Sequence, residues 1–128
     1  MRTLEGHKVN PANDKLTITV LGEPGAGRAH HKYMIEGYKR QVGTGEGPVE
    51  TGVVIAFQNG PIAEAGVNGI THEALLAILI DRLQAFQAGP FANPHNEAAL
   101  KYLEGAQHEL QARTKERMER GVEGTHNA

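Results

Sequence analysis

Residues 71–121 read THEALLAILIDRLQAFQAGPFANPHNEAALKYLEGAQHELQARTKERMERG and have the pattern of two helices joined by a short loop. Apolar side chains recur in this stretch at spacings of three and four, which places them on one face of an α-helix. We predict a first helix at residues 72–87 and a second from residue 94 to about residue 120. Gly89 and Pro90 stop the first helix, so the two helices should fold back on each other as an antiparallel hairpin.

The first helix has a defined start and a broad apolar surface. Thr71 is the predicted N-cap, because its hydroxyl can accept a hydrogen bond from a free backbone N–H of the first turn. Ile78 and Ile80 widen the apolar stripe, so we expect this helix to be buried on more than one side. The stripe itself consists of Leu75, Leu76, Leu79, Leu83 and Phe86.

The second helix has an apolar stripe that leads to two arginines. Asn93 is the predicted N-cap, with Pro94 at the first helical position, and Asn96 is an alternative cap. Spacings of four, three and four define the stripe, and the same spacings continued lead to Arg113 and Arg117. The apolar members of the stripe are Ala99, Leu103, Ala106 and Leu110.

The two helices differ in length, and the difference exposes the end of the second. At 1.5 Å per residue the first spans roughly 24 Å and the second roughly 40 Å, so the first covers the second only to about residue 109. The arginines beyond this point must meet the N-terminal part of the chain, a second copy of it, or an anionic ligand. Arginine favours a planar acceptor such as phosphate or carboxylate. The alternative is that Glu116 and Glu119 pair with these cations on a solvated helix end.

Composition limits the classes of protein to which the chain can belong. A length of 128 residues predicts one domain, or a small domain with an appendage. The net charge of -2 argues against a protein that binds DNA or RNA, since such proteins are normally basic. The absence of cysteine excludes a disulfide framework and a thiolate zinc site. No apolar stretch is long enough to cross a membrane, and we expect a soluble, intracellular protein without membrane association.

The first half of the chain alternates between apolar and polar residues and predicts an antiparallel sheet. Leu16, Ile18 and Val20 share one face of the first clear strand. Turns are expected at Glu36-Gly37 and at Asn59-Gly60, the second being the strongest hairpin signal in the chain. The predicted strands are residues 15–21, 29–35, 38–42, 49–58 and 61–67, preceded by a terminal arm that has room for one short strand.

A sheet followed by a helical hairpin defines an α+β fold. We assign residues 1–67 to the antiparallel β-sheet region and residues 68–128 to the helical hairpin and C-terminal tail. A flexible connection is expected at residues 43–48, between two of the strands.

Two patterns of candidate chemistry have competing interpretations. The glycine loop at residues 22–27, followed by Arg28, could hold phosphate through its backbone N–H groups, or could be an ordinary turn. It lacks the lysine and hydroxyl residue of a nucleotide-binding P-loop. The seven histidines lack the spacing of metal ligands, and no nucleophile has an evident base, since serine and cysteine are both absent. We therefore expect no metal, no cofactor and no catalytic residues.

Aromatic side chains near the hairpin loop suggest how a ligand could be held. Phe86 and Phe91 lie at this end, where a ring could stack on a nucleobase while Asn93 or Asn96 reads the base edge. Plain core packing is the alternative for Phe86. The arginines lie at the opposite end of an antiparallel hairpin, so the two ends meet only when a second chain packs head to tail. This geometry predicts a pocket shared by two subunits of a symmetric dimer.

Several segments resemble the first type of phage Thoeris anti-defence protein. This family shares its helical hairpin with the anti-CBASS cyclic-nucleotide sponges. The hairpin carries most of the resemblance, and residues 120–126, RGVEGTH, form its most specific part. The other similar segments are residues 57–62, 66–71, 75–83 and 86–90, together with the looser Pro24–Gly27.

The resemblance implies a non-enzymatic function. Members of this family are similar to molecular sponges that bind cyclic ADP-ribose isomers made by the TIR-domain protein of the Thoeris system, and keep them from the effector without cleaving them. The expected ligands here are cyclic ADP-ribose isomers, including glycocyclic ADP-ribose, in the cytoplasm of the host cell. Family members are homodimers, and some form hexamers, as trimers of dimers, that also hold cyclic trinucleotides; cyclic dinucleotides are a further candidate ligand.

The resemblance also assigns residues to the ligand pocket. It implies an aromatic at the end of the first helix, an asparagine at the start of the second, and two arginines near its end. In this sequence these residues are Phe86, Asn96, Arg113 and Arg117, with Arg28 as a weaker addition. Three other functions remain open: a sponge for CBASS cyclic oligonucleotides only, a nucleotide-degrading enzyme, and a small dimeric adaptor protein.

Overall fold

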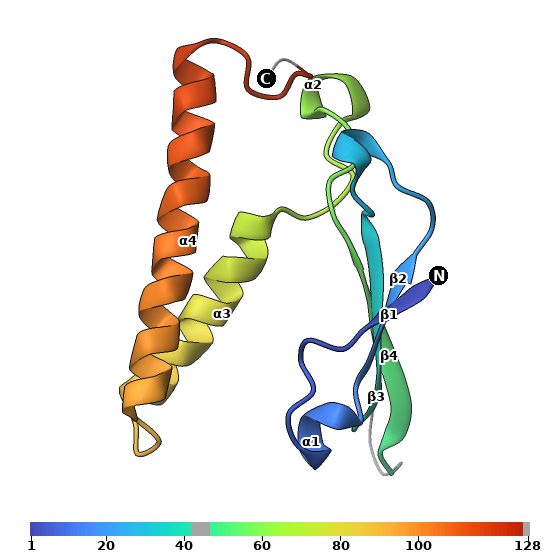
Figure 1. Cartoon of the computed structure of the whole chain (residues 1–128), viewed down its shortest axis with the longest axis vertical. Coiled ribbons are helices and arrows are strands. Elements are labelled where there is room, and N and C mark those ends of the chain that lie inside the picture. The colour runs from blue at the N-terminus through green and yellow to red at the C-terminus, as the bar shows by residue number, and fades with distance from the viewer. Residues whose placement is uncertain (42–46, 127–128) are drawn as a thin grey trace. The chain divides into compact units, whose positions relative to one another are not determined.

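The computed structural model describes residues 1–41 and 47–126, and its contacts divide the chain into two compact units, Met1–Gly60 and Pro61–Ala128. The first unit holds an antiparallel sheet and the second holds the helical hairpin (Figure 1). The predicted α+β class is therefore confirmed. The division that we placed after residue 67 remains a prediction, and most of the predicted connection at residues 43–48 lies outside the described residues.

The sheet has four antiparallel strands in the order β1-β2-β3-β4. Their register places the predicted apolar face on one side, because Ile18 pairs with Ile35 and Val20 pairs with Tyr33. Val20 is 1% exposed and is the one buried apolar residue of the described chain. The strands are β1 (Arg2–Leu4), β2 (Thr17–Leu21), β3 (Lys32–Arg40) and β4 (Val49–Ala56).

The predicted turn at Glu36-Gly37 is wrong, because β3 runs continuously through it. The register of β3 against β4 shifts between Glu36 and Tyr38, which marks a β-bulge. Gly37 has a φ of 101°, a left-handed conformation that favours glycine. The glycine favours a turn when the sequence is considered alone. In the structure β3 pairs with β2 on one side and with β4 on the other, and this pairing keeps Gly37 within the strand as part of a bulge.

The predicted fifth strand at residues 61–67 is also wrong. This segment forms the short helix α2 (Ile62–Ala65), which begins after Pro61 and ends at Gly66. Pro61 supplies no backbone N–H for a strand ladder, and as the residue before the helix it needs none. Two further short helices, which the sequence analysis did not predict, are α1 (Pro11–Asp14), capped by the Asn10 side chain, and the 3-10 turn η1 (Ala26–Arg28).

The helical hairpin matches its predicted bounds. Helix α3 spans His72–Gln87 and helix α4 spans Pro94–Glu119. The Thr71 hydroxyl accepts from the Ala74 N–H, as expected of an N-cap. Asn93 caps α4 by accepting from the Asn96 N–H at 2.8 Å, so the alternative cap at Asn96 is wrong.

The face by which α4 packs differs from the predicted stripe. Ala99 and Ala106 are exposed, whereas the half-buried side chains recur at steps of three and four along a neighbouring line. Larger leucines displace the small alanines from the contact with α3, because they bury more apolar area. The half-buried line of α4 consists of Leu100, Leu103, Gln107, Leu110, Thr114 and Arg117.

Helix α3 is buried on one side only, which corrects the expectation of burial on more than one side. Leu76, Ile80 and Leu83 are half-buried, but Ile78 is 64% exposed and Leu79 is 41% exposed. Within the second unit α3 has one neighbouring helix, α4, which covers one of its apolar faces. None of the described helices is both long enough and apolar enough to cross a membrane.

Candidate functional site at the overhanging end of the hairpin

The C-terminal part of helix α4 extends well past the N-terminal end of α3 (Figure 1). The contact between the helices reaches Gln107, whose Nε2 donates to the Glu73 backbone oxygen at 2.9 Å in the first turn of α3. Arg113 and Arg117 lie beyond this contact, so the predicted overhang is confirmed. Both arginines therefore project from a part of α4 that α3 does not cover.

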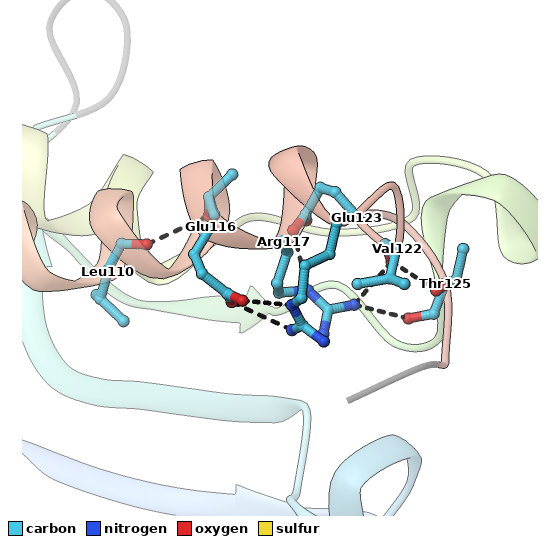
Figure 2. A network of polar contacts seen from close by, with 8 residues as sticks. Leu110, Glu116, Arg117, Val122, Glu123 and Thr125 are labelled. Carbon is cyan, nitrogen blue, oxygen red and sulfur yellow. Dashed lines mark hydrogen bonds and ion pairs between the residues drawn. The ribbon is translucent and has the colours of Figure 1, made fainter.

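The Arg117 side chain is held by the C-terminal tail of the same chain, residues 121–126 (Figure 2). Its Nε donates to Glu123 Oε2 at 3.0 Å, and its Nη2 donates to the backbone oxygens of Val122 at 2.9 Å and Thr125 at 3.1 Å. The side chain is only 19% exposed. The guanidinium is therefore fixed in position at the end of α4, with a carboxylate on its Nε edge.

The tail itself is an ordered turn. Gly121 has a φ of 73°, and the Val122 N–H donates back to the Arg117 backbone oxygen at 3.0 Å, as in a helix C-cap that ends on a left-handed glycine. The tail then reaches α2, where the Ala63 N–H donates to the Gly124 oxygen at 3.3 Å. These contacts join the end of α4 to α2 through the residues that surround Arg117.

Arg113 has a different environment from Arg117. It is exposed, beside the half-buried line and not in it, and the described part of the chain shows no hydrogen bond or ion pair from it. The expectation that both arginines follow the packing face is therefore correct for Arg117 and wrong for Arg113. The expected alternative is confirmed in part, since Glu116 pairs with Arg120, another cation of the overhang. Arg117 instead pairs with Glu123, which lies beyond the helix.

Phe86 lies near the C-terminal end of α3 and is partly exposed. The side chain is 36% exposed, and its ring meets that of Phe91 edge to face with centroids 6.5 Å apart. The Arg82 guanidinium lies 5.1 Å from the centroid of the Phe86 ring. The sequence analysis missed Arg82, although its spacing of four residues before Phe86 is a signal for such a contact. The ring thus packs against Phe91 and Arg82 and is also partly exposed, so both the packing and the stacking interpretations of Phe86 stay open.

Asn96 lies in the first turn of α4, near the same end of the hairpin. It is half-buried, and its backbone N–H donates to the Asn93 side chain, so its own carboxamide is not used as the helix cap. A rise of 1.5 Å per residue separates Asn96 from Arg117 by roughly 30 Å along α4. One chain therefore does not bring the asparagine and the aromatic ring together with the two arginines.

Arg28 follows a glycine loop that is built as a fixed turn in the first unit. The Ala26 N–H donates to Asn59 Oδ1 at 3.1 Å, and His31 Nε2 lies 2.9 Å from the Ala26 oxygen. A Cβ at Gly25 would lie 2.8 Å from Asn59 Oδ1, so a larger residue there would have to displace the Asn59 side chain. Arg28 is exposed and has a φ of 64°, an unusual conformation for a residue with a side chain. The loop joins two strands, as expected of a turn.

The described residues contain no cluster of side chains that could bind a metal ion. Within residues 1–41 and 47–126, no three histidine, aspartate or glutamate side chains come together in a way that could hold a metal ion. The groups that the helical unit does offer are guanidinium groups, an aromatic ring and carboxamides. This set suits an anionic ligand that also has an aromatic ring.

An antiparallel sheet followed by a hairpin whose longer helix ends in arginines defines a class of α+β hairpin proteins. Residues 50–115 match the family described as Acb2/Tad1, hairpin domain. This range covers half of the chain, and the protein belongs to the Acb2/Tad1 hairpin family.

A relative with a known role supports the same kinship. The chain is 49% identical over 72 residues to Thoeris anti-defense 1 of Bacillus phage SBSphiJ7. The match covers 56% of this chain and 51% of the relative, so the chain spans about half the length of the curated protein it matches. The predicted resemblance to the Thoeris anti-defence family is confirmed.

Proposed function

We propose that this protein is a phage anti-defence sponge. It binds cyclic ADP-ribose isomers, including glycocyclic ADP-ribose, in the host cytoplasm and keeps them from the Thoeris effector without cleaving them. Membership of the Acb2/Tad1 hairpin family and the 49% identity to a Thoeris anti-defence protein support this role. The absence of serine and cysteine agrees with binding in place of catalysis.

The proposed pocket has an aromatic half and a cationic half. Phe86, which is 36% exposed, stacks on the adenine, and Asn96 in the first turn of α4 hydrogen-bonds the nucleoside. Arg113 and Arg117 bind the pyrophosphate, since guanidinium groups match phosphate oxygens in charge and geometry. Cyclic ADP-ribose isomers carry both an adenine and a pyrophosphate, so one ligand would use both halves.

The length of α4 is the observation that carries the proposal that two chains share each pocket. Asn96 and Arg117 are separated by roughly 30 Å, which exceeds the reach of one nucleotide-sized ligand. Two hairpins packed head to tail about a two-fold axis bring the aromatic half of one chain to the cationic half of the other. A symmetric dimer of this kind has two identical pockets.

Capture and release tests the function directly. Purified protein is mixed with the product of a Thoeris TIR enzyme, unbound small molecules are removed, the protein is heat-denatured, and mass spectrometry identifies what is released. We expect an intact cyclic ADP-ribose isomer. Consumption of the input without retention would indicate a nucleotide-degrading enzyme instead.

Arg113 offers the cleaner test of the cationic half, because its replacement breaks none of the contacts of the tail. Arg113→Ala should weaken capture by at least about tenfold, since a hydrogen bond to a charged group is lost. Lys115→Ala is the matched control, because it removes one positive charge from the same exposed part of α4. Equal capture by the two variants, measured by isothermal titration calorimetry, would contradict the assignment of Arg113.

Cyclic oligonucleotides define the second candidate ligand class. The Acb2/Tad1 match supports it, and the exposed Arg28 on a fixed loop is a further candidate for a phosphate contact. Cyclic trinucleotides and dinucleotides should be offered in the same capture experiment, with a hexamer sought by light scattering. Retention of these alone would make the protein an anti-CBASS sponge, and retention of no nucleotide would favour a dimeric adaptor.

A further inference from the structure

The geometry points to Glu123 as the residue that sets the affinity and charge selectivity of the proposed phosphate site. We infer that its carboxylate occupies an edge of Arg117 that a phosphate of the ligand takes, so that the ligand must displace it. This inference rests on the proposed function, because it assigns Arg117 to ligand binding. Neither the family match nor the named relative assigns a role to Glu123.

The tail makes two kinds of contact with Arg117. Two backbone oxygens, from Val122 and Thr125, accept from Nη2 at 2.9 and 3.1 Å and hold the guanidinium in place. Glu123 Oε2 accepts from Nε at 3.0 Å and supplies the negative charge. A carboxylate and a phosphate present similar oxygens to a guanidinium, so both compete for the same donor edge. The Val122 and Thr125 oxygens are uncharged and do not mimic a phosphate.

The exposure of the two partners favours displacement. The side chain of Arg117 is 19% exposed and is anchored, whereas that of Glu123 is 40% exposed and can turn into solvent. Gly121 and Gly124 flank this segment with φ values of 73° and 80°, so the tail turns at both ends of Val122 and Glu123. The carboxylate can therefore leave without loss of the backbone contacts that hold Arg117.

Because a ligand must displace the Glu123 carboxylate, the site favours ligands with more than one negative charge. A monoanion replaces one negative charge by another and gains little, whereas a pyrophosphate brings two charges, with Arg113 close by on the same helix to receive the second. Glu123 thereby disfavours singly charged anions at the cost of some affinity for the ligand. A positioning role would give the opposite effect, since loss of a supporting contact weakens binding.

Glu123→Gln tests the inference, because glutamine can still accept from Arg117 Nε but carries no charge. Glu119→Gln is the matched control, since it makes the same change of net charge on exposed α4, and the described part of the chain shows no ion pair from Glu119. The dissociation constant of glycocyclic ADP-ribose is measured for the wild type and both variants by isothermal titration calorimetry, with thermal melting to verify the fold. We expect Glu123→Gln to bind about two- to fivefold more tightly and Glu119→Gln to bind as the wild type does.

The other possible results of the titrations overturn either the competition by Glu123 alone or the proposed function as well. Unchanged or weaker binding by Glu123→Gln, with ligand bound by the wild type, overturns the competition and leaves the proposed function standing. Tighter binding by both variants attributes the gain to net charge and also overturns it. Absence of binding by the wild type overturns the proposed function and this inference together.

Discussion

Gly37 shows how a single residue maintains the sheet. Its φ of 101° lies in the left-handed region, and it sits at the bulge where the register of β3 shifts. A Cβ at this position would overlap the backbone oxygen of Lys15. Both the backbone conformation and the space therefore require glycine.

Gly37→Ala should lower the free energy of unfolding by about 1–3 kcal/mol, because alanine is strained at positive φ. Urea denaturation followed by circular dichroism measures the change. Gly6→Ala is the control, since a Cβ there meets nothing within 4 Å. Equal stabilities of the two variants would show that the bulge tolerates a side chain.

Asn93 and Asn96 lie three residues apart but have separate roles. The Asn93 side chain accepts from the Asn96 N–H at 2.8 Å and caps α4, whereas the Asn96 carboxamide is available to a ligand in the proposed pocket. Asn93→Ala should cost about 1 kcal/mol of stability. Asn96→Ala should instead weaken capture of glycocyclic ADP-ribose and leave the melting temperature nearly unchanged. Loss of stability in Asn96→Ala with unchanged capture would remove it from the pocket.

At the scale of the element, the side chains by which α4 packs against α3 differ from the apolar stripe that the spacing of the sequence predicts. Leu100 and Leu103 direct α4 toward α3, and the line that they begin continues through Gln107 to Arg117. The Gln107 Nε2 donates across the interface to the Glu73 oxygen, which fixes the alignment of the two helices. Arg117 thereby lies on the side of α4 that also packs, and Arg113 does not.

The tail is an element in its own right. Residues 121–126 close on Arg117 and reach α2 through Gly124 and through His126, whose Nδ1 lies 3.3 Å from Glu64 Oε2. The most specific part of the family resemblance, residues 120–126, therefore coincides with the segment that holds a proposed phosphate-binding arginine. The physical basis of that pattern is two glycines at positive φ and the carbonyl groups between them.

At the scale of the whole molecule, the helical unit leaves several of its large apolar side chains exposed. Neither α3 nor α4 contains a buried residue, and Ile78, Leu79 and Phe86 are each at least 36% exposed on α3. Two helices with one shared interface bury little apolar area relative to the entropy lost on folding. A second copy that covers this face would supply the missing burial.

The melting temperature should therefore rise with protein concentration, because dissociation accompanies unfolding of a dimer. Circular dichroism melts over a 100-fold concentration range, on the order of micromolar to tenths of millimolar, measure the shift. Light scattering should give at least twice the chain mass of 13.8 kDa. A melting temperature independent of concentration, together with a mass of one chain, would contradict the shared pocket.

The sequence by itself determined the hairpin, both of its caps and its overhang. These features depend on local rules, namely the 3.6-residue period, the capping geometry of Thr71 and Asn93, and the fixed rise per residue. It also determined the apolar face of the sheet, since alternation along a strand is local too. The resemblance in residues 57–126 also led to the family from the sequence, because a resemblance depends on residue identities alone.

The tertiary structure decided the features that depend on contacts between residues far apart in the sequence. Pairing on both sides of β3 converted the expected turn at Gly37 into a bulge, and the tail that reaches α2 accompanies a helix where a fifth strand was expected. Contact with α3 selected leucines over alanines for the packing line of α4. The folded tail gave Arg117 its carboxylate partner, Glu123, which no periodicity within α4 indicates because it lies beyond the helix end.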